Sequence, residues 1–550
     1  MAGGSEDVLE GSEIEGVSGE GTSVADPGRK YMTGWRLHAL SFGITLSLFL
    51  STLETTIVST SLISVTNALH GFDQGSWVVT SYMLTYTGFL VIYAKFSDIF
   101  GRKSMMIIAL VVFTVFSILC GVSQNMLQLI VFRAFQGLGG SGIYAMSMVI
   151  PPDMVPLEKF GLYMGIISSV FALSSILGPI LGGVINDKTT WRWVFLLNAP
   201  GGCGALALIA LVLPSNFPHP KLPERRGLGE VFSKSAFRRL DWRGTSLSLA
   251  ASVLLVYALQ EAATDFRWNS AKVISTLTIS VLCWVGFALW ERVVEQHADG
   301  IQEPIFPWRV AKNRAAGGVF LSVFFTGFPF LGAIISLPQR FQIVNGTSAA
   351  GAGIRLFPMV LAAPLASWFS AVLITAAKIP AFYVLTVACS LQVVGLALMS
   401  TLPTDTMVVA NAQYAYEAIM GVGFGLAIPT AILFLSVLVE AKDQAVVMGA
   451  ITQIRVLGGT VGLAISATLL SSDVKSKLPK LLNPQQLAAL LRSSRALETF
   501  DDEIRVRVRF VYAEAYNRQM ILLTGFAAAS LLSLGLSFER KARTLDIAKI

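Results

Sequence analysis

The chain has 550 residues, of which 54% are hydrophobic and only 14% are charged, with a formal net charge of +7. Soluble domains carry about 25% charged residues because water must wet their surface, so this composition excludes a large soluble enzyme. The positive charge does not indicate a nucleic-acid partner, because no soluble segment carries a basic stripe with interleaved aromatic residues. Long apolar runs separated by short polar gaps predict an all-α membrane protein.

Residues 1–34 hold seven acidic residues against two basic ones, with many Gly and Ser, which predicts a disordered acidic cytosolic tail. After this tail come apolar segments. A helix that crosses the ~30 Å hydrocarbon core needs about 20 apolar residues. Fourteen segments are predicted to span the membrane, namely residues 38–63, 77–94, 104–124, 127–149, 162–185, 193–213, 244–261, 272–291, 316–338, 351–376, 380–401, 408–438, 445–470 and 520–538.

Basic residues gather in the gaps on one side of these spans. They lie in the gaps 94–103, 214–243 and 292–315 and in the tail 539–550. The positive-inside rule places these gaps, and with them both ends of the chain, in the cytosol. An even number of spans agrees with that placement.

The gap 471–519 lies outside in this topology, yet it carries nine Lys and Arg mixed with six acidic residues. Its stretch Pro484–Tyr516 is predicted to form an amphipathic helix that lies on the membrane face or caps the bundle. The sequon Asn345-Gly346-Thr347 also falls in an outside loop, which makes Asn345 a candidate glycosylation site.

An internal repeat divides the chain. Arg133–Gly139 echoes Glu417–Gly423 at an offset of 284, and Leu177–Gly182 echoes Leu457–Gly462 at an offset of 280. Two ordered matches at nearly one offset predict two parallel halves around a central site. The predicted units are an N-terminal six-helix half (35–213), cytoplasmic loops with two additional spans (214–315), a C-terminal six-helix half (316–538) that includes the extracellular loop 471–519, and a cytosolic tail (539–550).

Five short motifs follow one another in the first 200 residues. They are Leu53-Glu54-Thr55-Thr56-Ile57-Val58 in span 1, Ala94-Lys95-Phe96-Ser97-Asp98-Ile99-Phe100-Gly101-Arg102-Lys103 between spans 2 and 3, Arg133-x-x-Gln136-Gly137-x-Gly139 in span 4, Gly178-Pro179-x-x-Gly182-Gly183 in span 5, and Trp191-Arg192-Trp193-Val-Phe195-Leu-Leu-Asn198-Ala-Pro200 at the start of span 6. Gly101 allows a tight turn, and Asp98 can accept from a basic side chain. In span 5, small residues four apart let helices approach closely, and Pro179 permits a bend.

These motifs carry a resemblance to a known family. The second resembles the signature loop of the major facilitator superfamily, with Ala94 in place of the usual first Gly, and the fourth resembles the signature of its antiporters. The first resembles the Leu-Asp-x-Thr-Ile-Val motif of the fourteen-span drug:proton antiporters, in which Glu54 keeps the carboxylate. The resemblance covers roughly residues 35–540. It implies the major facilitator fold, with two six-helix halves and two extra central spans, and a cytoplasmic gating loop that includes Asp98, Gly101, Arg102 and Lys103.

Two intramembrane charges are predicted to meet. Glu54 lies roughly 15 Å and Arg133 roughly 11 Å from the outer ends of their spans, at 1.5 Å per residue. Because spans 1 and 4 both border the central cavity in this fold, we expect the two side chains to interact and Glu54 to bind the driving proton. Desolvation favours the neutral carboxyl and the arginine favours the charged one, which suits a group that loads and unloads a proton. The alternative is a permanent ion pair that fixes helix packing.

Further polar residues are candidates for substrate contact. Glu417 and Arg455 form a second intramembrane set, which coordinates substrate or serves packing or gating. Gln136 and Asn198 are candidates to line a site.

The function that follows is proton-coupled export of small hydrophobic compounds, as in fungal toxin and multidrug efflux pumps. No phosphate-binding loop is present, so we predict no cofactor and a proton gradient as the driving force. We also predict no metal site, because the four cysteines lie in apolar runs without ligand spacing. The expected partners are substrate, protons and the lipid bilayer around a monomer in the plasma membrane. The alternatives are a vacuolar basic amino-acid transporter, a siderophore transporter and a non-transporting sensor.

Overall fold

The apolar segments form helices in the computed structural model, which describes residues 32–155, 157–214, 217, 241–265, 269–296, 308–375, 377–439, 444–492 and 494–540; these residues contain no strand. The helices up to residue 212 are α1 (Trp35–Ala68), α2 (Gly75–Phe100), α3 (Arg102–Val122), α4 (Met126–Val149), α5 (Pro151–Met154), α6 (Leu157–Lys188), α7 (Arg192–Leu196) and α8 (Asn198–Val212). The later helices are α11 (Trp242–Asp265), α12 (Ala271–Gln296), α13 (Trp308–Lys312), α14 (Arg314–Ile343), α15 (Ala349–Arg355), α16 (Phe357–Thr375), α17 (Ala381–Ser400), α18 (Ala412–Leu438), α19 (Gln444–Lys477), α20 (Pro484–Arg492) and α21 (Asp502–Ser533). The predicted acidic tail up to residue 31, the loop residues 218–240 and 297–307, and the last ten residues lie outside the described part.

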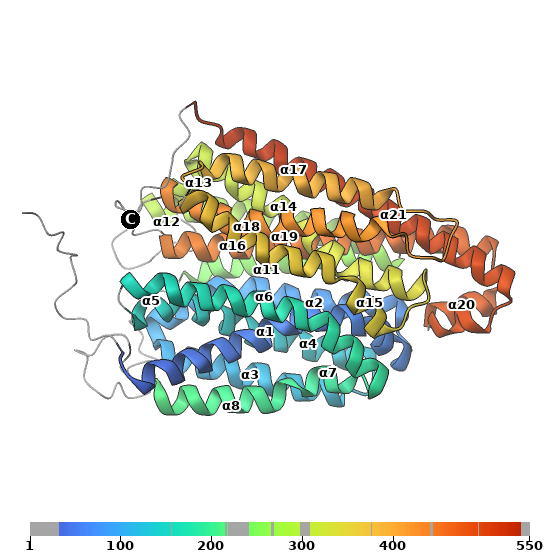
Figure 1. The fold of residues 1–550 in the computed structure, drawn as a ribbon, viewed down its shortest axis with the longest axis horizontal. Coiled ribbons are helices and arrows are strands. Elements are labelled where there is room, and N and C mark those ends of the chain that lie inside the picture. The colour runs from blue at the N-terminus through green and yellow to red at the C-terminus, as the bar shows by residue number, and fades with distance from the viewer. Residues whose placement is uncertain are drawn as a thin grey trace, which may run out of the picture.

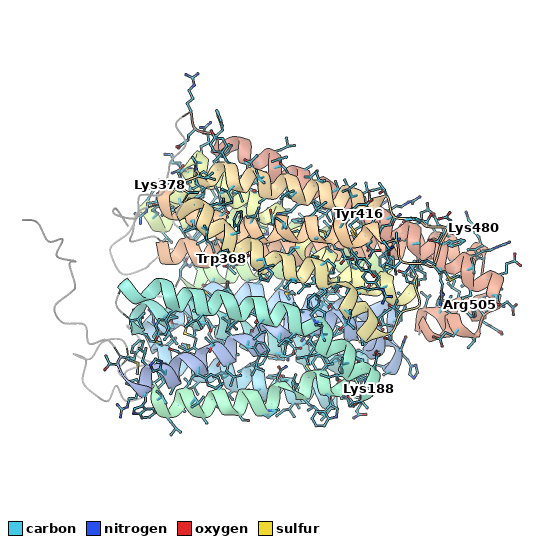
Figure 2. All side chains as sticks on the ribbon, in the orientation of Figure 1. Lys188, Trp368, Lys378, Tyr416, Lys480 and Arg505 are labelled. Carbon is cyan, nitrogen blue, oxygen red and sulfur yellow. The ribbon has the colours of Figure 1, made fainter. Side chains whose placement is uncertain are left out.

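Eleven of the described helical segments are long and apolar enough to cross a membrane. The other three predicted spans coincide with α2, α4 and α6. Large apolar side chains point away from the bundle, including Leu211 at 85%, Leu532 at 78% and Trp368 at 70% exposure. Trp368 lies between the two ends of the bundle (Figure 2). Exposed apolar side chains at this depth fit a lipid surrounding.

Helix ends follow from local side chains and from glycine. At the start of α4, the Asn125 side chain accepts a hydrogen bond of 2.9 Å from the backbone N–H of Gln128, which satisfies a donor that the helix leaves free. Gly101 joins α2 to α3 with φ 89°, a conformation that favours glycine. The tight turn expected there is present.

Two sets of helices repeat one pattern of neighbours. In the N-terminal set (α1–α8), α1 packs on α6 and α8, and α4 packs on α2 and α3. In the C-terminal set (α14–α19 and α21), α14 packs on α19 and α21, and α18 packs on α16 and α17. The two sets lie side by side, blue to green and yellow to red in Figure 1. Between them, α11 packs on both α2 and α19, and also on α12.

The prediction of one amphipathic helix over Pro484–Tyr516 is wrong. The helix α20 ends at Arg492, a short 3₁₀ turn covers Ser494–Thr499, and α21 begins at Asp502 and continues through the last predicted span. Two acidic residues, Asp502 and Glu503, occupy the first turn of α21, where the helix dipole stabilises negative charge. A new helix therefore begins inside the segment that was predicted to be continuous.

The C-terminal end of α19 and the N-terminal end of α21 extend past their predicted spans and hold α20 against the bundle at its right-hand end in Figure 1. Lys480 and Arg505 lie at that end, opposite Lys378 (Figure 2). Apolar residues of this cap pack on one another and on Ile63 and Ile343. The segment therefore caps the bundle, which is the second of the two predicted placements.

Acidic partners offset part of the positive charge of this cap. Arg518 pairs with Asp473 at 2.8 Å, and Lys477 pairs with Glu514 at 2.7 Å. Both pairs join α19 to α21, so several of the basic residues in the loop 471–519 lie beside acidic ones.

Candidate functional site

Glu54 lies in the middle of α1 and is completely buried. Its Oε1 forms an ion pair with Arg133 Nη1 from α4, as the sequence predicts. Its Oε2 accepts a hydrogen bond of 2.5 Å from Asn198 Nδ2 at the start of α8. One carboxylate thus joins three helices of the N-terminal set.

Arg133 has partners in addition to Glu54. Its Nε donates to the backbone carbonyl of Val78 in α2 at 3.0 Å, and its Nη1 donates to Gln136 Oε1 at 2.8 Å. The guanidinium carbon lies 4.3 Å from the centre of the Tyr82 ring, within the range of a cation–π contact. A buried arginine held this way keeps polar contacts when the charge on Glu54 changes.

Gln136 and Asn198 belong to this network. Gln136 Nε2 donates to Ser117 Oγ in α3 at 2.8 Å, and both amide side chains are buried. Their contacts position Glu54 and Arg133. Sequence reasoning missed Tyr82 and Ser117, because neither carries a charge or belongs to a motif.

The described part of the loop motif between α2 and α3 links four helices. Arg102 Nε pairs with Asp153 Oδ2 in α5 at 3.3 Å and donates through Nη1 to Ser97 Oγ in α2 at 2.5 Å. Lys103 Nζ donates to the carbonyl of Ala210 in α8 at 2.7 Å. The side chain of Asp98 lies outside the described residues. Asp153, which the sequence did not single out, is the acidic partner that the structure gives to this loop.

The span 5 motif packs α6 on α1. A Cβ at Gly182 would lie 2.4 Å from the carbonyl oxygen of Ile57, so only glycine fits without movement. Gly178 faces the same helix. The carbonyl of Pro179 accepts a hydrogen bond of 3.1 Å from Thr60 Oγ1, and α6 continues through this proline.

The same motif also forms a contact between the two helix sets. A Cβ at Gly183 would lie 2.4 Å from Cα of Ala350 in α15, and one at Gly353 would lie 2.3 Å from the carbonyl oxygen of Pro179. Asp187 Oδ2 accepts a hydrogen bond of 3.1 Å from the backbone N–H of Ala350. These contacts lie near the capped end, where the sets touch backbone to backbone.

Glu417 and Arg455 are not brought together as an ion pair. Glu417 is fully buried in α18, where its Oε1 accepts a hydrogen bond of 3.2 Å from Gln413. Its Oε2 has no hydrogen-bond partner among the described residues. Arg455 in α19 lies with its guanidinium carbon 5.5 Å from the centre of the Phe330 ring.

The sequon asparagine is held in the fold. Asn345 is half-buried, and its Nδ2 donates to the carbonyl of Met407 at 2.9 Å. Its glycosylation stays a prediction. Over the described ranges, no cluster of three or more His, Cys, Asp or Glu is placed to hold a metal ion.

Comparisons with known proteins identify relatives of this chain. Residues 44–463 match the model of the Major Facilitator Superfamily. The chain is 50% identical over 513 residues to the MFS-type transporter FPY5 of Fusarium mangiferae, a match that covers 93% of this chain and 85% of that protein. It is 29% identical to the MFS-type efflux pump MFS1 of Trichophyton rubrum, covering 92% of each, and 30% identical to Multidrug resistance protein 3 of Bacillus subtilis, covering 79% and 80%.

Two solved structures share the fold. A bacterial homologue of the lysosomal transporter Spinster, in an inward-facing and occupied conformation, matches with a TM-score of 0.64 at 15% identity, covering 92% of this chain and 97% of that one. A D-xylose–proton symporter matches with a TM-score of 0.56 at 12% identity, covering 92% and 99%.

Proposed function

We propose that this chain, which belongs to the major facilitator superfamily, exports small hydrophobic compounds in exchange for protons. Its family makes it a multi-pass membrane transporter and not an enzyme. The finer architecture of the proposal is fourteen spans in two six-helix halves with two central additions, acting as a monomer in the plasma membrane without a cofactor. The repeated neighbours of the two helix sets support the halves, and relatives named as efflux pumps support export.

The observation that carries the proposal is the position of Glu54. Its carboxylate is buried and joins α1 to α4 and α8. A proton on Glu54 removes the negative charge and weakens its contacts with Arg133 and Asn198. Arg133 then keeps its hydrogen bonds to the carbonyl oxygen of Val78 and to the amide oxygen of Gln136. Protonation is thereby linked to helix packing, while the guanidinium of Arg133 still has hydrogen-bond acceptors.

The second part of the proposal is alternating access. The helix sets touch at Gly183 and Gly353 near the capped end, so this end must part to release substrate outside. In the proposed cycle, a proton from outside reaches Glu54 while this end is open and leaves towards the cytosol after closure. Close glycine contacts suit such a cycle because they have no side chains to rearrange.

The test is export by cells that lack their own pumps. Cells with this protein should accumulate less of a panel of labelled hydrophobic toxins, and a protonophore should reverse the difference. Glu54→Gln should abolish gradient-driven export while direct substrate binding to purified protein persists. Glu503→Gln, on an exposed turn of α21, is the matched control and should export normally. Surface biotinylation verifies that each variant reaches the plasma membrane.

Two outcomes would contradict the proposal. Normal protonophore-sensitive export by Glu54→Gln would remove Glu54 from coupling. Raised accumulation in cells that carry the protein would indicate uptake instead of export. A permanent structural ion pair predicts a third pattern, in which Glu54→Gln loses folded protein, and size-exclusion chromatography of the purified variant detects that loss.

A further inference from the structure

Arg455 differs from the other arginine in the middle of the helix sets. Arg133 has the carboxylate of Glu54, whereas Arg455 forms no ion pair with any carboxylate in the described part of the chain. The Arg455 side chain is half-buried in α19. Because arginine stays protonated in proteins, this position holds a permanent positive charge.

Aromatic residues lie on both sides of the boundary near this charge. Phe330, whose ring lies 5.5 Å from the guanidinium carbon of Arg455, packs edge-on against Phe424 at 5.5 Å between ring centres. From the N-terminal set, the rings of Tyr86 and Tyr144 pack edge-on with 6.1 Å between their centres.

A polar contact places this group at the boundary between the sets. Tyr144 Oη of α4 lies 3.5 Å from Thr452 Oγ1 of α19, one turn before Arg455. The guanidinium therefore lies where α2 and α4 meet α14, α18 and α19. In a transporter of this architecture, the boundary between the halves is where substrate binds.

The charge at this boundary favours an anion as its ligand. The contact with the Phe330 ring does not neutralise the guanidinium, whose charge stays partly exposed at this boundary. The planar guanidinium matches a carboxylate through two parallel hydrogen bonds. The aromatic side chains offer an apolar surface next to it.

We propose that the compound carried is an organic anion, an apolar or aromatic body with a carboxylate that binds Arg455 between the helix sets. This inference rests on the proposed transport function and specifies its substrate class. Phe330 and Tyr144, which are partly exposed, contact the apolar body, and the buried Phe424 packs against Phe330. The charge of the substrate, and not its hydrophobicity alone, decides which compounds bind.

The test uses three probes with one apolar body and different charges: pyrenebutyrate, its methyl ester, and a pyrenebutyl trimethylammonium salt. Binding to the purified full-length protein is followed by pyrene fluorescence without a proton gradient. Pyrenebutyrate should bind about tenfold or more tightly than the ester, since a hydrogen bond to a charged group contributes about 1.5–3 kcal/mol. Arg455→Gln should remove that preference, Arg455→Lys should keep part of it, and Arg507→Gln, an exposed arginine of α21, should leave it unchanged.

Several outcomes would overturn the proposal. They are absence of pyrenebutyrate binding, equal or tighter binding of the ester or the cation, and an anion preference that survives in Arg455→Gln. If Glu417→Gln restores export to Arg455→Gln, the arginine serves Glu417 and not the substrate, and the proposal fails. Size-exclusion profiles of Arg455→Gln and Arg455→Lys show whether each variant is folded before binding is measured.

The same experiment separates this inference from the proposed function. Anion binding that depends on Arg455, together with absent proton-driven export, would contradict the export proposal alone. Proton-driven export of neutral or cationic compounds that is unaffected in Arg455→Gln would contradict the substrate class alone.

Discussion

The two helix sets pack alike at corresponding glycines. In α4, a Cβ at Gly137 would lie 2.2 Å from the carbonyl oxygen of Tyr82 in α2. In α18, a Cβ at Gly421 would lie 2.4 Å from the carbonyl oxygen of Met359 in α16. The same holds for α6 and α19, where Gly178 and Gly458 approach α1 and α14.

The polar groups at corresponding positions differ. Arg133 precedes Gly137 in α4 by four residues, and Glu417 precedes Gly421 in α18 by the same spacing. Gly178 faces Thr56 in α1, and Gly458 faces Phe324 in α14. Glu54 and Ser322 each precede the faced residue by two positions, so they also correspond. Glu54 binds Asn198 in the last helix of its set.

Ser322 makes the corresponding contact in the C-terminal set. It lies 2.9 Å from Ser530 Oγ in α21, the last helix there, and Thr326 lies 2.9 Å from the same oxygen. A charged network in one set therefore corresponds to a network of hydroxyl groups in the other. The packing is shared because close helix contacts tolerate few residues, whereas the chemistry has diverged between the sets.

Among the substitutions that test this difference between the sets, Arg133→Met should reduce the stability of the protein most. It leaves Glu54 buried with its charge uncompensated, which costs about 3–5 kcal/mol. Thermal unfolding of the purified protein should show a large loss of stability, and adding Glu54→Gln should recover part of it. Arg507→Gln is the control. Equal stability of Arg133→Met and the control would show that the pair contributes nothing to the fold.

The shared packing is tested by Gly137→Ala and Gly421→Ala. Each new Cβ meets a backbone carbonyl, so each variant should lose about 1–3 kcal/mol, and the two losses should be similar. Gly525→Ala in α21 is the matched control, since no atom lies within 4 Å of its added Cβ. A loss at Gly137 alone would mean that the two sets do not pack equivalently.

Part of this architecture could be predicted from sequence, and the reasons are physical. Lipid requires long apolar helices, so the spans could be located. A buried charge requires a partner, so Glu54 and Arg133 could be paired. The carbonyl of Val78 could not be predicted, because a backbone acceptor leaves no mark in a sequence. The break before α21, by contrast, left a mark, because Asp501, Asp502 and Glu503 form the acidic start that is typical of a new helix.

A smaller test compares the contacts of the last helices. Asn198→Ala removes a hydrogen bond to a charged carboxylate and should cost about 2 kcal/mol, whereas Ser530→Ala removes neutral contacts and should cost about 1 kcal/mol. Unfolding midpoints of both variants measure the difference. Ser275→Ala, an exposed hydroxyl of α12, controls for loss of a hydroxyl group. A greater loss of stability in Ser530→Ala than in Asn198→Ala would contradict the prediction that the charged network contributes more than the hydroxyl network.

The smallest effect is expected from Glu417→Gln, although Glu417 is as buried as Glu54. Glu417 has no cation beside it in the described part of the chain, and the new amide can keep the contact with Gln413. The variant should therefore stay within about 1 kcal/mol of the parent in unfolding free energy. Glu54→Gln should lose more, because it takes the counter-ion from Arg133. If instead both variants lose the same amount, Glu417 must bind a cation in the folded protein, and the two sets would be alike in chemistry as well as in packing.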